Sequence, residues 1–328
     1  MMTLQTIRIP KTGVDARRPY GLSLVELMIA LVISSILLAG VISIFVSTRQ
    51  SQQYNATMAR MQENARYIFD RLSTDIAAAG FLGCLDTSED NAVRSDLSDT
   101  SNAYDFSLPV TGSDATGLNN TDILRVKRAT TTFGIPLTAT ASGTAALQLD
   151  DSNSEYSDLQ QWDIIAVGDC GNATTLLITN DPTGSSGSIE HKAGIAATSG
   201  ANAGISNVTG DLLIGSYGSS RGTPARAFRL VSRTYLVGAS TTGSGMSIYR
   251  DSVATNNELI DGVSDFQVLY GENTDGNDGA DRYVSANNVS DWNNVVAVRV
   301  SLSLSTTLPD GNTITRDFEK TVQLRNRL

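Results

Sequence analysis

The sequence has little of what most enzyme sites are built from. Among its 328 residues there is one histidine, His191, and there are two cysteines. One histidine cannot supply a histidine-centred catalytic group or a Cys/His metal cluster, and no glycine-rich phosphate-binding motif precedes a predicted helix. Asp and Glu are plentiful, but no motif or spacing in the sequence identifies two of them as a catalytic pair. We therefore expect no enzymatic activity and no required cofactor, and we expect His191 to be solvated in the polar stretch that contains it.

Positive charge and aromatic residues are also scarce. The chain has 24 Lys and Arg against 34 Asp and Glu, which gives a net charge of −10. Four basic residues and one acidic residue fall in the first 21 positions, so the remaining chain carries about −13. Such a chain lacks the electrostatic footprint of a nucleic-acid-binding protein. Only 6% of the residues are aromatic, whereas Gly, Ser, Thr, Asn and Asp are abundant, which is typical of a loop-rich β domain.

One long apolar run covers residues 22–46, and its only charged residue is Glu26. At about 1.5 Å per residue, a helix over this run is roughly 37 Å long and can cross a hydrocarbon core of about 30 Å. Arg17 and Arg18 precede the run, which predicts a cytoplasmic amino terminus and a periplasmic or extracellular remainder. A carboxylate in a membrane span costs about 2.5–3.5 kcal/mol at the bilayer centre and less near its edge, so Glu26 is expected to be functional.

The residues around Glu26 resemble the class III signal of type IV prepilins. Gly21 directly precedes the apolar run, and Glu26 is the fifth residue after Gly21. This resemblance implies that the prepilin peptidase cleaves between Gly21 and Leu22, that the new amino group of Leu22 is methylated, and that Glu26 is required for assembly. The family usually has Phe where this chain has Leu22. An ordinary secretory signal has an apolar core of only about 7–15 residues, and a simple uncleaved anchor is the remaining alternative.

The helix is predicted to continue beyond the membrane. Residues 49–79 contain no Pro or Gly, and Gly80 is typical of a helix end. Apolar residues recur at a spacing of three and four, which indicates one buried helix face. They are Met58, Met61, Ala65, Ile68, Leu72, Ile76 and Ala79. The predicted organisation is a prepilin leader (1–21), a transmembrane and polymerisation helix (22–46), its amphipathic continuation (47–80) and a loop-rich β globular domain (81–328).

The remainder of the chain is predicted to form antiparallel strands. Val296, Val298 and Val300 alternate with less apolar residues, as in a strand with one buried and one solvated face. Asp261-Gly262 is a predicted turn, and the polar stretch 180–210 is a predicted surface loop. The fold class is therefore α+β, a long amino-terminal α-helix followed by an antiparallel β-sheet domain. The predicted strands are 123–127, 162–167, 174–179, 211–214, 227–237, 246–250, 263–270, 295–304 and 313–324.

Several motifs resemble the PilW family of type IV pilus minor pilins. They are AAGFLGC at 78–84, LIDGV at 259–263, FQVLYG at 266–271 and DWNNVVAVRV at 291–300, whereas residues 90–225 carry no such motif. The resemblance implies a pilin-like fold and a role in starting the pilus. In that role the chain joins other minor pilins in a tip or priming complex, which primes the major pilin, carries a tip adhesin and supports twitching motility and adhesion.

The same resemblance implies a location and leaves two alternatives. The chain would be a single-pass inner-membrane protein with a periplasmic β domain, later found in the pilus at the cell surface. The first alternative is a pseudopilin of type II secretion, which shares the signal and the helix. The second is a membrane-anchored calcium-binding or adhesive module that is never polymerised.

Cys84 and Cys170 form an even pair in a chain predicted to face an oxidising compartment. That setting favours one disulfide. Cys84 follows the predicted helix end, and Cys170 follows a predicted strand. The alternative is two unrelated buried thiols.

The segment 272–283 is a candidate calcium loop. Side-chain oxygens recur at Asn273, Asp275, Asn277 and Asp281, with glycines that permit sharp turns. The segment departs from the EF-hand pattern, because the first ligand is Asn, the sixth position is Asp278 and no glutamate closes the loop. The alternative is an acidic hairpin turn, since Asp, Asn and Gly are also ordinary turn residues.

Overall fold

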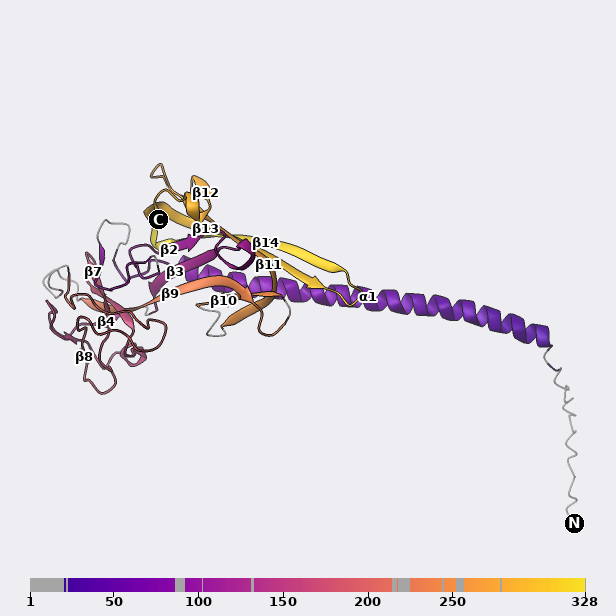
Figure 1. Ribbon diagram of the computed structural model, residues 1–328, viewed down its shortest axis with the longest axis horizontal. Coiled ribbons are helices and arrows are strands. Elements are labelled where there is room, and N and C mark those ends of the chain that lie inside the picture. The colour runs from indigo at the N-terminus through magenta and orange to yellow at the C-terminus, as the bar shows by residue number, and fades with distance from the viewer. Residues whose placement is uncertain are drawn as a thin grey trace, which may run out of the picture. The chain divides into compact units, whose positions relative to one another are not determined.

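The computed structural model describes residues 21, 23–85, 92–101, 103–130, 133–213, 217, 225–243, 245–251, 257–277 and 279–327 (Figure 1). Two compact units are present, Met1–Ala56 and Thr57–Leu328. The second unit holds all the strands together with the last part of the first helix, so the globular unit begins at Thr57, inside the helix.

The long helix predicted from the sequence is confirmed. Helix α1 spans Leu24–Ala77 and has Glu26 in its first turn. Its carboxy-terminal part buries the apolar face that the three-and-four spacing predicted, including Met61, Ile68 and Leu72. Gly80 follows with a φ of +73°, a left-handed conformation that favours glycine and ends a helix.

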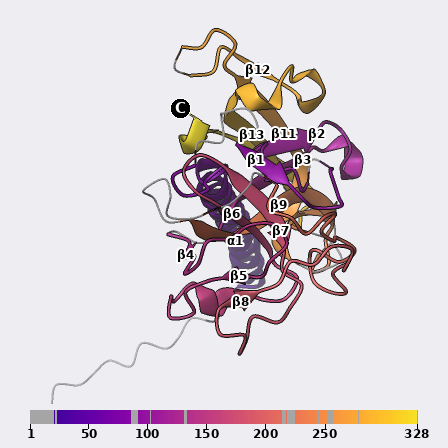
Figure 2. The same cartoon turned by 90° about the vertical axis from the view of Figure 1, so that its left-hand side faces the viewer.

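The second unit contains a large, mostly antiparallel sheet, which confirms the α+β fold class (Figures 1 and 2). Its main strand order is β1-β7-β6-β9-β10-β11-β13-β14, and among the strands in the described residues β1 and β7 alone pair in parallel. The strands are β1 (Val93–Ser95), β2 (Val110–Ser113), β3 (Ile123–Ala129), β4 (Ile135–Pro136), β5 (Leu147–Gln148), β6 (Ile164–Gly168), β7 (Ala173–Leu177), β8 (Ser188–Ile189), β9 (Arg226–Ala239), β10 (Met246–Arg250), β11 (Glu258–Glu272), β12 (Arg282–Val284), β13 (Val295–Thr307) and β14 (Thr313–Gln323). Short 3₁₀ helices lie at Leu118–Asn120, Tyr156–Asp158, Ala286–Asn288, Trp292–Asn294 and Arg325–Arg327.

Strand β9 joins two parts of the sheet. Its first half pairs with β6, with Ala166 opposite Phe228. Its second half pairs with β3 and β10, with Leu124 opposite Tyr235 and Ile248 opposite Val237. Strand β9 therefore connects the part of the sheet without family motifs to the part that contains them.

The hydrophobic interior has three clusters. The first lies between α1 and the carboxy-terminal strands and brings Ile68 and Leu72 together with Phe266 and Val300. The other two are built mainly from residues between positions 82 and 230, around Ile165 and Phe228 among others. The carboxy-terminal part of α1 therefore packs against the carboxy-terminal strands, while the middle of the chain has separate hydrophobic cores.

Two local predictions of secondary structure are wrong, one of a strand and one of a turn. No strand forms over the described part of 211–214, and Leu212 is buried without regular pairing. Asp261-Gly262 is not a turn between strands, because β11 begins earlier, at Glu258. Gly262 has a φ of +73°, and the pairing of β11 with its neighbours shifts here, so the strand passes through an irregularity and continues.

Candidate functional site

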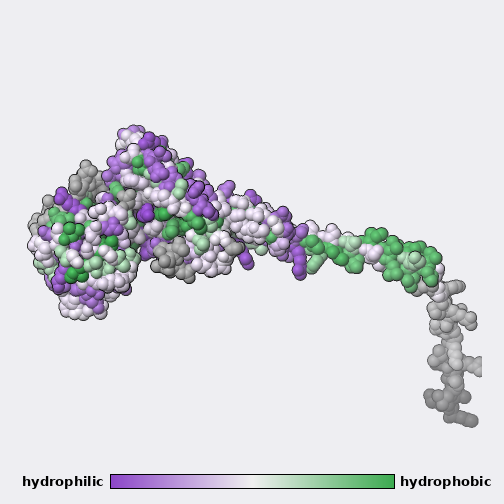
Figure 3. All heavy atoms as spheres, in the orientation of Figure 1, coloured by the Kyte–Doolittle hydropathy of each residue, from purple (hydrophilic) through white to green (hydrophobic). Residues whose placement is uncertain are grey.

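The amino-terminal part of α1 is apolar and exposed. Figure 3 shows the apolar residues gathered along it, and residues 24–46 are all exposed. This helix is long and apolar enough to cross a membrane. The hydroxyl of Ser35 donates to the carbonyl of Val32 at 2.8 Å, so this polar group is satisfied within the helix. Because burying one large apolar side chain is worth about 1.5–3 kcal/mol, this surface favours lipid or other apolar helices around it.

The predicted cleavage and assembly residues lie at the start of this helix. Gly21 is exposed, and Leu22 lies outside the described residues. Glu26 is exposed in the first helical turn, where the helix dipole favours a negative charge. Within the described residues, its exposed carboxylate makes no hydrogen bond or ion pair.

The predicted disulfide is confirmed. Cys84 and Cys170 are bonded, with their Cα atoms 5.0 Å apart and 86 positions apart in sequence. Cys84 follows the end of α1, and Cys170 lies between β6 and β7. The carboxylate of Asp169 accepts hydrogen bonds from the amides of Gly171 at 2.9 Å and Asn172 at 3.1 Å, which shapes the turn that presents Cys170. The bond therefore ties the end of the helix to the sheet of the middle region.

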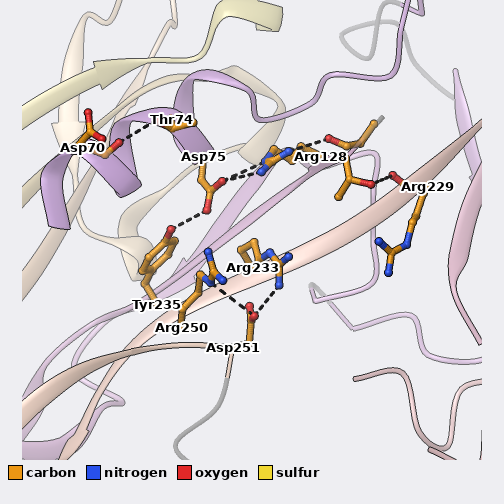
Figure 4. Close-up of polar contacts among 11 residues, drawn as sticks. Asp70, Thr74, Asp75, Arg128, Arg229, Arg233, Tyr235, Arg250 and Asp251 are labelled. Atoms are coloured by element: carbon orange, nitrogen blue, oxygen red, sulfur yellow. Dashed lines mark hydrogen bonds and ion pairs between the residues drawn. The ribbon is translucent and has the colours of Figure 1, made fainter. Parts of the chain in front are cut away.

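A buried polar cluster also ties α1 to the sheet (Figure 4). Asp75 lies on the buried face of α1, and the guanidinium of Arg128 on β3 contacts its carboxylate at 2.9 Å. The hydroxyl of Tyr235 on β9 donates to the other carboxylate oxygen at 2.6 Å. Burial and then the charge of Asp75 raise the pKa of Tyr235, so the phenol stays a donor. Sequence reasoning missed this cluster, although a charged residue beside the buried Leu72 and Ile76 was a visible signal.

Glu258 organises the connection between β9 and β10. Its carboxylate accepts hydrogen bonds from the hydroxyls of Ser247 at 2.6 Å, Ser240 at 2.9 Å and Thr241 at 2.5 Å, and from the Thr241 amide at 3.0 Å. Burial alone would raise the pKa of Glu258, but the hydrogen bonds from Ser247 and Thr241 outweigh it and lower the pKa to about 2. Glu258 therefore holds this hairpin as a carboxylate at neutral pH.

The candidate calcium loop begins at an ion pair between a buried carboxylate and an exposed guanidinium. Glu272 is fully buried and contacts the guanidinium of Arg282 at 2.9 Å, while the Ser290 hydroxyl donates to it at 2.6 Å. Burial alone would raise the pKa of Glu272, but the hydrogen bonds from Ser290, Asp291 and Arg282 lower it. These contacts close the base of the loop.

Within the loop, the predicted ligand oxygens accept hydrogen bonds from the loop itself. Asn273 accepts from the amide of Gly276 at 2.8 Å, and Asp275 accepts from the amide of Asn277 at 2.9 Å. These are the local bonds of Asn and Asp in turns. The composition of the loop is therefore already explained by its turn geometry.

Asp281 is engaged in the same way. It accepts from the amide of Thr274 at 2.5 Å and from its hydroxyl at 3.0 Å, and these bonds lower the pKa of Asp281. Asp278 lies outside the described residues, and within the described ones no group of three His, Cys, Asp or Glu side chains is placed to hold a metal ion. Calcium binding stays a prediction. A calcium-dependent rise in the melting temperature of the full chain, lost in Asp275→Ala, would support calcium binding. An unchanged melting temperature would mean that the segment is only a turn.

His191 is not solvated, which corrects the expectation from sequence. It is 2% exposed, and its ring nitrogens lie 3.0 Å from the Gly210 carbonyl and 2.9 Å from the Ala145 carbonyl. Most residues of the surrounding stretch 180–210 are exposed, as expected of a surface loop, and two buried side chains anchor it to the rest of the fold. Asp96 accepts from the amide of Gly210 at 2.7 Å, and Asn207 bonds the amide of Leu177 at 2.7 Å.

Two comparisons with known families agree with this architecture. Residues 16–42 match the prokaryotic N-terminal methylation motif, the signal of prepilins. Residues 234–316 match the type IV pilus-assembly protein W family, PilW, and this match runs from the second half of β9 into β14. No curated protein and no solved structure gives a match.

The fold and the amino-terminal match indicate the class first: the chain carries a prepilin-type signal, a helix long and apolar enough to anchor it in a membrane, and a β domain. The second match, over residues 234–316, then confirms the resemblance to PilW, and together the two matches support a minor pilin related to the type IV pilus.

Proposed function

We propose that this minor pilin takes part in starting type IV pilus assembly, as a member of a tip or priming complex. One observation carries the proposal. The helix that follows the prepilin signal buries Ile68 and Leu72 against Phe266 and Val300, which belong to the sheet that matches PilW. The amphipathic continuation of the polymerisation helix and the family-specific sheet thus share one hydrophobic core, as a subunit that enters a filament by its helix requires.

In this proposal the chain begins as a single-pass inner-membrane protein with its β domain in the periplasm. The prepilin peptidase cleaves between Gly21 and Leu22, and the new amino group of Leu22 is methylated. The subunit then leaves the bilayer and packs its exposed apolar helix against the helices of other minor pilins and the major pilin. The work is assembly and not catalysis, and the proposed complex carries a tip adhesin at the cell surface and supports twitching motility.

Glu26 has a specific part in this process. A carboxylate buried among apolar helices needs a cation or donors, because an unpaired buried charge is costly. The amino group of Leu22, in this subunit or a neighbour, is the cation that cleavage creates at the same end of the helix. We propose that this pairing sets the register of the subunit, so that an uncut precursor cannot join the filament.

The test is complementation of a deletion strain with matched variants. Gly21→Trp should leave the precursor uncut and the cells without pili. Glu26→Ala should give a cleaved, membrane-resident protein whose mass begins at Leu22, yet still no pili. Glu63→Ala is the control, because Glu63 is exposed on the same helix outside the apolar run.

Three results would contradict the proposal. Normal piliation by Glu26→Ala would contradict the pairing of Glu26 with the amino group of Leu22. A mature chain beginning at Met1 would contradict cleavage after Gly21. Loss of exoprotein secretion with normal pili would instead identify a pseudopilin of type II secretion.

A further inference from the structure

We propose that β14 accepts an extended segment of a different protein as an additional strand of the sheet. β14 is the last strand in the main order, and in the described part of the chain it pairs with β13 alone. These features of β14 are independent of the proposed role in pilus assembly. The two ideas can fail separately.

The hydrogen-bond register shows which backbone groups of β14 face outward. The amide of Leu324 donates to the carbonyl of Val296 at 2.9 Å, and that of Leu308 donates to Asn312 at 2.8 Å. Both pairs are directly opposite in the β13–β14 register, so the even-numbered residues of β14 bond to β13. The outward N–H and C=O groups therefore belong to Thr313, Thr315, Asp317, Glu319, Thr321 and Gln323.

This edge is long and regular. β14 has 11 residues, eight of them exposed and none buried, and its pairing with β13 contains no register shift. It also contains no proline. Natural sheets usually protect an edge with bulges, proline, charged side chains or a very short strand, and of these β14 has only the charged side chains. The other end of the main strand order follows that rule, because β1 has only three residues.

The charges on β14 disfavour a second copy of the same chain. In an antiparallel pair of two β14 strands centred on Phe318, Asp317 lies opposite Glu319 and Arg316 lies opposite Lys320. Like charges directly opposite each other are destabilising. Shifting the pair by one step of the register in either direction places Asp317 opposite Asp317 or Glu319 opposite Glu319. The occupant is therefore a strand of different sequence.

The same charges define the chemistry of that strand. Positions opposite Asp317 and Glu319 favour Lys or Arg, and positions opposite Arg316 and Lys320 favour Glu or Asp. Ile314, Phe318 and Val322 are half-buried on the face that packs towards the first core, so the positions opposite them favour apolar residues. Main-chain bonds then supply affinity and alternate side chains supply specificity, as in other cases of strand addition.

The test uses a fluorescent peptide of 11 residues, matched to β14 in length. Its sequence is Thr-Val-Thr-Glu-Lys-Val-Lys-Glu-Thr-Val-Thr, which places Lys opposite the acidic residues and Glu opposite the basic ones. The control peptide exchanges every Glu and Lys. With the full chain in detergent, fluorescence anisotropy should show saturable binding of the first peptide at least tenfold tighter than the control. Hydrogen exchange should slow at the outward amides of β14.

Two variants test the site itself. Thr321→Pro removes one outward N–H and leaves the ladder with β13 intact, so it should weaken binding at least tenfold, whereas Thr321→Val should not. If Thr321→Pro lowers the melting temperature, the double variant Asp317→Lys with Glu319→Lys serves instead, and it should reduce the preference between the two peptides. Absence of binding, equal binding of both peptides, or binding unchanged by Thr321→Pro in a folded chain would overturn the proposal.

Discussion

The phenol of Tyr235 lies 2.6 Å from the carboxylate of Asp75, across the interface between β9 and α1. Arg128 contacts the same carboxylate from β3. Three elements thus meet at one buried charge, in the unit that contains the sheet. Because the apolar contacts around this point would tolerate some sliding of the helix, we infer that the three polar groups fix its register on the sheet.

We predict that Asp75→Ala lowers the free energy of unfolding by about 2–4 kcal/mol, because it leaves a half-buried guanidinium and a buried phenol without their common acceptor. Tyr235→Phe should cost about 1–2 kcal/mol, since it removes one donor and keeps the packing. Denaturant unfolding of the full chain in detergent measures both. Asp70→Ala, an exposed acidic residue on the same helix, should cost less than about 0.5 kcal/mol, and an equal loss in both Asp variants would contradict the special position of Asp75.

The disulfide makes a second prediction. Closing a loop of 86 residues restricts the unfolded chain by about 4–5 kcal/mol in chain-entropy estimates, with smaller values in practice. Cys84→Ala with Cys170→Ala should therefore lower the melting temperature, and reduction should affect the wild type alone. Labelling of thiols in the unfolded, non-reduced wild type should modify neither cysteine, and two labelled cysteines would show that the bond does not form.

The parts of this fold that could be predicted from the sequence are those in which apolar residues recur with a clear period. The three-and-four spacing over 58–79 and the alternation around Val298 located the helix and the central strands because each reports one buried face. The two cysteines were paired correctly because composition and compartment leave few choices for a pair. These signals are local or nearly so, and a single sequence contains them.

What sequence reasoning missed depends on partners that are distant in the chain. Asp75 bonds to Tyr235 across 160 positions, and His191 bonds to Ala145 across 46. Asp96 anchors the mostly exposed stretch 180–210 by accepting a hydrogen bond from the amide of Gly210, which is 114 positions away. Polarity predicted the exposure of most of this stretch but not the burial of His191, because no local pattern reports distant partners.

Glu258 makes a prediction about acid. Its folded pKa, about 2, lies below its ordinary value of 4.5, so its carboxylate stabilises the fold above about pH 4.5. That contribution is lost as the pH falls from 4.5 towards 2. Because the side chain is partly exposed, we discount the shift and expect Glu258→Gln to cost about 1–2 kcal/mol at pH 7. The difference between the variant and the wild type should shrink near pH 2 in denaturant titrations, and a constant difference across this range would contradict the assignment.

For Lys127 we predict the opposite effect, because burying its ammonium group destabilises the fold. Its side chain on β3 is 1% exposed, and its ammonium group donates to the Thr111 hydroxyl at 3.3 Å. Burial lowers the pKa of Lys127 from 10.5 to about 7, although the charge of Asp105 opposes the shift. Between pH 7 and 10.5 the unfolded chain binds more protons at this residue than the folded one, so this residue makes stability rise with pH. Below pH 7 the full cost is present, and above pH 10.5 it vanishes.

We therefore predict that Lys127→Met stabilises the chain most at pH 6 and least at pH 10. The shift corresponds to at most about 5 kcal/mol, and the lost contact with Thr111 reduces the gain, so we expect about 1–3 kcal/mol at pH 6. Lys320→Met, on the exposed edge strand, is the control and should show little change at either pH. Denaturant unfolding at both pH values decides the matter. A variant that is less stable than the wild type at pH 6 would mean that the buried ammonium makes contacts worth more than its desolvation.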